Sequence, residues 1–135
     1  MTGYSGTPLL KKLGLKETMK VCLINTPADY MNILEADING QLVSKMHLAD
    51  FIHLFATSKK ELAKQFQQII KEAKDGLVIW ISWYKKSSGL QTDITEDTIR
   101  EIVLPTGWVD IKVCAVNDIW SGLKIVKRKP AIKKI

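Results

Sequence analysis

The chain has 135 residues, of which 46% are hydrophobic and 25% are charged, and its formal net charge is +6. This length suits one domain, and the hydrophobic fraction is high enough to bury a core without disulfides or a structural metal. The longest apolar run, residues 76–83, is too short for a membrane helix, and the start of the chain lacks a signal-peptide pattern, so we expect a cytoplasmic protein without a membrane partner.

The positive charge is concentrated at the C-terminus. Residues 127–135 contain five basic residues and no acidic one, so the rest of the chain is close to neutral. Pro130 and the scattered apolar residues beyond it indicate an irregular segment rather than a recognition helix. We predict one domain over residues 1–128 and a basic tail over 129–135, for which a solvated end is favoured over a nucleic-acid contact.

The first elements in chain order are a loop, a short helix and a strand. Residues 1–6 are small and polar, and Thr7 with Pro8 is suited to begin a helix that ends at Gly14. Residues 19–24 are apolar on both faces, as expected of a central parallel strand.

A second helix and a second strand are predicted next. Thr26 and Pro27 are typical of a helix start, and Tyr30 lies on the apolar side of that helix. After a turn at 37–40, residues 42–46 predict a short strand.

The middle of the chain alternates strand and helix. Residues 51–56 form an apolar run, and Ser58 with Glu61 predicts a reciprocal capping box at the start of an amphipathic helix that ends near Lys74. Residues 76–84 follow, apolar on both faces, and are predicted to lie in the middle of the sheet.

The last third predicts a helix and a hairpin. Residues 95–104 have helical spacing and end at Pro105, so Asp93, Glu96 and Asp97 before and within the first turn are interpreted as helix capping rather than acid–base catalysis. Residues 109–116 and 123–128 are predicted as an antiparallel hairpin at one edge of the sheet, with 123–128 exposed.

This order predicts a single Rossmann-like three-layer α/β domain, whose mostly parallel sheet ends in an antiparallel hairpin. In such sheets ligands bind beyond the carboxyl ends of the strands. The predicted rim comprises Asn25, Thr26, Ser58, Lys85, Lys86, Ser87, Ser88 and Gly89. Two helix amino termini and two lysines suit an anionic or nucleotide-like ligand, and the loop Tyr4, Ser5, Gly6 and Thr7 is a candidate lid. The alternative is a solvated turn at 85–89 and a front loop that merely packs.

Other chemical signatures are weak. His47 and His53 are six residues apart, which does not suit two metal ligands on one helical turn, and His53 alternates with apolar residues as a core histidine does. Cys22 and Cys114 stand alone in apolar segments and are expected to be buried and reduced. No catalytic residue, metal or cofactor is assigned from these patterns.

The order of elements in the second half of the chain resembles the carboxy-terminal half of a class I methyltransferase fold. This order is a strand at 50–56, a helix, a strand at 76–83, a second helix, and two strands at 107–116 and 123–128. That resemblance implies S-adenosylmethionine as cofactor. The family's glycine-rich loop is replaced here by residues 25–28, which contain no glycine, and its acidic residue after the second strand is absent from 44–46.

A second resemblance rests on motifs that span most of the chain. They are GYSGTPL at 3–9, KKLG at 11–14, KKSSG at 85–89, TDITED at 92–97, VDIKVCAV at 109–116 and WSGLK at 120–124. These are similar to a bacterial family of unknown function, domain of unknown function 3052. The resemblance implies no established activity.

Three functions follow from these observations. The first is a non-catalytic Rossmann-like domain that binds an anionic small molecule or a protein partner at the rim. The second is a divergent S-adenosylmethionine-dependent methyltransferase, and the third is a nucleic-acid accessory protein that uses its basic tail. The sequence leaves open whether the protein is an enzyme.

Overall fold

The computed structural model describes residues 8–129 and shows a five-stranded sheet in the order β1-β2-β3-β5-β4. The strands are β1 (Val21–Ile24), β2 (Phe51–Phe55), β3 (Val78–Tyr84), β4 (Trp108–Ala115) and β5 (Trp120–Lys127). The α-helices are α1 (Leu9–Leu13), α2 (Tyr30–Leu34), α3 (Lys59–Glu72) and α4 (Glu96–Val103). Short 3-10 turns are η1 (Asn39–Gln41), η2 (Met46–Leu48), η3 (Lys86–Ser88) and η4 (Leu104–Thr106). Strands β1, β2 and β3 are parallel, whereas β5 is antiparallel to both of its neighbours. The predicted fold class is confirmed.

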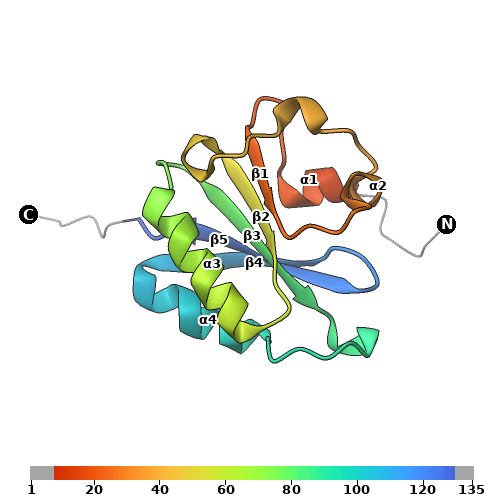
Figure 1. The fold of residues 1–135 in the computed structure, drawn as a ribbon, viewed down its shortest axis with the longest axis vertical. Coiled ribbons are helices and arrows are strands. Elements are labelled where there is room, and N and C mark those ends of the chain that lie inside the picture. The colour runs from red at the N-terminus through yellow and green to blue at the C-terminus, as the bar shows by residue number, and fades with distance from the viewer. Residues whose placement is uncertain (1–7, 130–135) are drawn as a thin grey trace, which may run out of the picture.

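Two hydrophobic clusters lie on opposite faces of the sheet. Alternate residues of β3 point to opposite sides, so Ile79 and Ile81 join the cluster that contains the α3 residue Phe66, while Trp80 joins the cluster that contains Leu13 of α1. The indole Nε1 of Trp80 also donates to the carbonyl oxygen of Leu13 at 2.9 Å. Figure 1 shows α3 and α4 side by side at one side of the sheet, and α1 and α2 together near β1.

The amphipathic pattern of residues 58–74 is confirmed as α3. Ser58 is its N-cap, and Leu62, Phe66 and Ile69 form the buried stripe that packs on the sheet. The strands predicted at 51–56 and 76–84 are confirmed, with β2 and β3 inside the sheet. The local patterns of this central part therefore agree with its tertiary environment.

The C-terminal hairpin is confirmed, but its order in the sheet differs from the prediction. β5 pairs with β3 through Ile81 and Leu123, so the strand predicted to be the exposed edge is interior, and β4 is the outer strand. β5 can approach the Trp80 side chain of β3 closely at Gly122, because this residue has no side chain. A β-carbon there would stand 3.1 Å from the Trp80 ring and 3.2 Å from Val116.

The strand predicted at 42–46 is wrong. Only Leu42 forms a bridge, with Val21, and the amide of Val43 donates to the Val21 carbonyl at 2.8 Å. The turns η1 and η2 leave too few extended residues between them for a ladder. β1 is therefore an edge strand of the sheet, opposite β4, rather than a central one.

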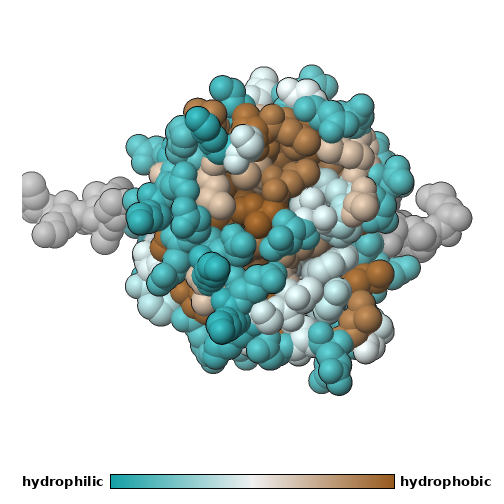
Figure 2. Space-filling model, in the orientation of Figure 1, coloured by the Kyte–Doolittle hydropathy of each residue, from teal (hydrophilic) through white to brown (hydrophobic). Residues whose placement is uncertain are grey.

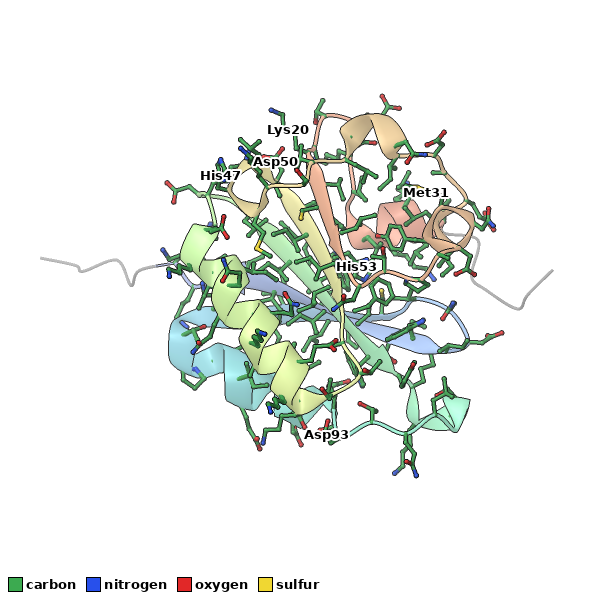
Figure 3. All side chains as sticks on the ribbon, in the orientation of Figure 1. Lys20, Met31, His47, Asp50, His53 and Asp93 are labelled. Carbon is green, nitrogen blue, oxygen red and sulfur yellow. The ribbon has the colours of Figure 1, made fainter. Side chains whose placement is uncertain are left out.

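The Asp50 side chain links the residue before β1 to the segment between α3 and β3. Its carboxylate accepts from the Lys20 amide at 2.8 Å and pairs with the Lys74 ammonium at 2.6 Å. These two contacts hold the pKa of Asp50 below its usual value, chiefly through the Lys20 amide. Figure 3 shows Lys20 and Asp50 together at one end of the sheet, opposite Asp93.

None of the helices within residues 8–129 is both long and apolar enough to cross a membrane.

Candidate functional site

The carboxyl ends of three parallel strands lie next to one another. Ile24 of β1 is in register with Leu54 of β2, and Leu54 is in register with Ile81 of β3. Asn25, Ala56 and the segment from Lys85 therefore emerge at the same end of the sheet. This end, with the first turn of α3, is called the rim below.

Asn25 makes the sharp turn after β1. Its backbone is left-handed, with φ of 55°, a conformation that asparagine tolerates better than most residues other than glycine. The turn directs the Asn25 side chain to α3, where its Nδ2 donates to Oε1 of Glu61 at 3.3 Å. An exposed carboxamide and a half-buried carboxylate are thus paired at the rim.

The helix start predicted at Thr26 and Pro27 is wrong. α2 begins at Tyr30, and it has only five residues. Pro27 is followed by a turn at residues 28–29 instead of a helix, with the Tyr30 amide bonded to the Pro27 carbonyl at 3.1 Å, and Asp29 is the N-cap of α2. Thr26 is half-buried and provides no helix amino terminus to a ligand.

Ser58 is an N-cap, as predicted, but its capping box is only half formed. Its hydroxyl oxygen accepts from the Glu61 amide at 3.2 Å, while the Glu61 carboxylate is bonded to Asn25. A second carboxylate, that of Asp93, satisfies another free amide of the first turn, because its Oδ1 accepts from the Lys59 amide at 2.6 Å. The amino end of α3 therefore already contacts an anionic group of the protein itself.

The segment after β3 folds back toward α3. The Lys85 amide donates to the Ile119 carbonyl at 2.7 Å, and the Ser88 hydroxyl donates to the Lys85 carbonyl at 2.6 Å. Further along, Thr92 Oγ1 donates to the Thr57 carbonyl at 2.8 Å. The turn that contains Ser88 is thus held by its own hydrogen bonds.

The remaining residues of the predicted rim are exposed. Lys86, Ser87 and Gly89 are exposed in and after η3, which projects beyond the end of β3 in Figure 1. None of the ion pairs formed among residues 8–129 involves Lys85 or Lys86. The candidate lid at residues 4–7 lies outside the described residues, as does the predicted cap Thr7. Pro8 is the N-cap of α1 rather than its first helical residue.

Asp93 was assigned to the wrong helix by sequence. It caps α3, whereas α4 is capped by Thr95, whose Oγ1 accepts from the Thr98 amide at 3.2 Å. Glu96 and Asp97 lie in the first turn of α4, as expected, and pair with Arg100. The bridge from Asp93 to Lys59 spans 34 residues, and local spacing gives no signal for it.

A buried polar chain lies between the sheet and α2. The hydroxyl of Tyr30 is 2.8 Å from Nδ1 of His53, and His53 Nε2 is 2.7 Å from the hydroxyl oxygen of Ser82. His53 and Ser82 are fully buried, and burial lowers the pKa of His53 to about 3. The imidazole is therefore neutral, with one nitrogen donating and the other accepting. The prediction of a satisfied core histidine is confirmed.

The two cysteines differ in how far they are buried. Cys22 is buried, as predicted, whereas the prediction that Cys114 is buried is wrong: Cys114 is half-buried on β4, an edge strand, and both cysteines are free thiols. Burial raises the pKa of each thiol, so neither has the lowered pKa that marks a reactive cysteine.

Two surface features lie away from the rim. A shallow, open hollow of about 410 Å³ is lined by Met31, Asn32, Glu35, Ala36 and Asp37 at the C-terminal end of α2. Figure 2 shows an apolar area near β1 and the segment that precedes β2, where Leu42 and Leu48 are exposed. Neither feature contains a residue of the predicted rim.

Comparisons with known proteins show the fold. No family model matches the chain, and no curated protein matches it, so the resemblance to domain of unknown function 3052 is not confirmed. Among solved structures, the B. subtilis m1A22 tRNA methyltransferase TrmK is similar with a TM-score of 0.58 and 11% identity, over 92% of this chain and 67% of that one. A Sulfolobus solfataricus protein assigned as a type 11 methyltransferase is similar with a TM-score of 0.60 and 15% identity, over 94% of this chain and 93% of that one.

A third similar structure is a protein of the NADB-Rossmann superfamily from Streptococcus agalactiae, with a TM-score of 0.58 and 8% identity over 98% of this chain and 73% of that one. At these identities the likeness shows the architecture alone. The methyltransferase-like order of elements is confirmed.

Proposed function

We propose that the rim binds S-adenosylmethionine and that the protein is a divergent methyltransferase of this fold. The observation that supports this best is the Asn25–Glu61 pair at the adjoining ends of β1 and α3. A carboxylate accepts hydrogen bonds from hydroxyl and ammonium groups, and a carboxamide both donates and accepts. S-Adenosylmethionine offers ribose hydroxyls, an ammonium and a positively charged sulfonium.

The turn after β1 fits such a ligand in one respect. The absent glycine loop is replaced by Asn25, whose left-handed backbone makes the sharp turn that glycine would otherwise provide. The second strand of the methyltransferase fold, which ends in an acidic residue, has no counterpart at residues 42–46, because these residues form only the bridge at Leu42. Glu61 is the carboxylate that we assign to the ribose or ammonium instead.

The amino end of α3 argues against a phosphate at that position. Ser58 and Asp93 already contact the first amides of this helix, and an anionic ligand would meet the Asp93 carboxylate. When bound, S-adenosylmethionine would supply an electrophilic methyl group. The role of Asn25 and Glu61 is to hold and orient the ligand.

A non-catalytic domain for an anionic ligand or a protein partner is the second candidate. It is favoured by Lys85 and Lys86, which belong to none of the ion pairs formed within residues 8–129. In this case phosphate or nucleotides should stabilise the protein, and replacing both lysines by alanine should remove that effect without changing the melting temperature of the free protein.

A thermal-shift titration separates these candidates. Ligand at 100 times its Kd adds about 2.7 kcal/mol to the free energy of unfolding, which a domain of this size shows as several degrees. We expect a shift with S-adenosylmethionine and S-adenosylhomocysteine. Asn25→Gly should keep the left-handed turn and the stability of the free protein but reduce the shift, as should Glu61→Gln.

The matched control is Glu17→Gln, which removes an exposed carboxylate outside the rim. Its shift should equal that of the wild type. Equal shifts in Asn25→Gly, Glu61→Gln and the control would refute the assigned role of the pair, and no wild-type shift with either adenosyl compound would refute the proposed function.

A further inference from the structure

Two lysines face each other on the outer hairpin. Lys112 of β4 is the direct cross-strand partner of Lys124 of β5. Directly opposed like charges destabilise a sheet. A negatively charged group placed between the two ammonium groups would offset this repulsion.

Both lysines extend toward the C-terminal end of α1. Lys112 Nζ donates to the carbonyl oxygen of Lys12 at 3.2 Å, and Lys124 Nζ lies 3.7 Å from where a β-carbon on Gly14 would stand. The helix carbonyl satisfies one N–H of Lys112, but it carries no full charge. The partial negative charge of a five-residue helix offsets little of two ammonium charges.

The Asp110 carboxylate of the hairpin does not neutralise this cluster. Asp110, on the same strand as Lys112, pairs with Arg100 of α4 at 3.0 Å. Among residues 8–129, no ion pair includes Lys12, Lys112 or Lys124. Cys114 is on the same strand as Lys112, and the charges of Lys112 and Lys12 partly oppose the rise that burial causes in its pKa.

We propose that Lys112 and Lys124, at the C-terminal end of α1, form an anion site that binds a phosphate group, either free or in the backbone of a nucleic acid. Ammonium groups bind phosphate as point charges, and two of them together match its multiple negative charge better than one. A bound phosphate would also remove the repulsion between Lys112 and Lys124. The site is built from α1 and the hairpin, so it does not depend on the Asn25–Glu61 pair.

The test compares the wild type with Lys112→Gln/Lys124→Gln, using inorganic phosphate and a single-stranded oligonucleotide as probes at two salt concentrations. Each removed ammonium should weaken binding by about tenfold, which corresponds to about 1.4 kcal/mol, because the phosphate loses one charge-assisted hydrogen bond. With the oligonucleotide, each lost phosphate contact should reduce the slope of log K against log salt by about 0.7. Lys64→Gln, an exposed lysine of α3 outside the ion pairs, should bind both probes as the wild type does.

Lys124→Gln alone serves as a second variant, because it keeps the hydrogen bond from Lys112 to α1 and should fold. A response of the wild type to phosphate alone identifies a free phosphate ligand, and a response only to the oligonucleotide identifies a nucleic-acid backbone. The proposal is overturned if neither probe binds the wild type, or if the variants bind as tightly as Lys64→Gln. The response to S-adenosylhomocysteine should be the same in all of these proteins, which keeps this test separate from that of the rim.

Discussion

For the His53 side chain, burial could be predicted from the sequence but hydrogen-bond partners could not. His53 is one of two histidines and sits among apolar residues, so its burial could be predicted. Its partners could not be predicted, because Tyr30 and Ser82 come from distant parts of the chain. The only local signal is Ser82 itself, a small polar residue inside the apolar run of β3.

Burial of neutral His53 makes the stability of the protein depend on pH. The pKa of His53 is about 3 in the folded protein and 6.5 in its ordinary state, so below pH 6.5 the unfolded chain binds a proton that the folded protein does not. The free energy of unfolding should therefore fall as pH decreases from 6.5 toward 3, approaching about 1.4 kcal/mol per pH unit. Urea unfolding between pH 7.5 and 5 measures this loss before most carboxylates titrate.

His53→Gln should abolish most of that slope, although it begins from a lower stability because the buried partners are disturbed. His47→Gln is the control, since the side chain of His47 is 54% exposed. The explanation fails if the wild type and His53→Gln lose stability in parallel between pH 7.5 and 5.

Single elements were predicted best where their own residues determine them. The cap and apolar stripe of α3 lie within one segment, and so do the two runs of the hairpin. The segment 42–46 also contains apolar residues, but the 3-10 turns on either side of it limit its pairing with β1 to the bridge at Leu42. The insertion of β5 between β3 and β4 likewise depends on long-range pairing that adjacent residues do not reveal.

The cap of α3 by Asp93 links the segment after β3 to this helix. Asp93→Ala should lower the free energy of unfolding by about 1 kcal/mol, because the Lys59 amide loses its acceptor. Asp93→Asn keeps an acceptor oxygen and should lose less. Urea unfolding at neutral pH measures both changes.

Asp97→Ala is the matched control. Its side chain is 87% exposed and pairs with Arg100, which retains Glu96 and Asp110 as partners. A loss in Asp93→Ala no greater than that in Asp97→Ala would show that the contact with Lys59 contributes nothing to stability.

The whole molecule combines a methyltransferase-like sheet with a rim that departs from the expected one. Parallel order could be predicted from the alternation of strands and helices, and it brings Asn25, Ala56 and Lys85 to one end. The contacts at that end could not be predicted, since Asn25 and Glu61 are 36 residues apart and a left-handed backbone at Asn25 joins them. The phosphate site proposed on the hairpin depends on a contact across 100 residues.

The measurement that tests the rim most directly is an amide ¹H–¹⁵N spectrum of the protein with and without S-adenosylhomocysteine, which resembles the cofactor but cannot transfer a methyl group. We expect the shifted resonances to cluster at residues 25–28 and 56–61, with those of Lys112 and Lys124 unchanged. Saturating ligand that leaves the Asn25 and Glu61 amides unperturbed would contradict the proposed binding site.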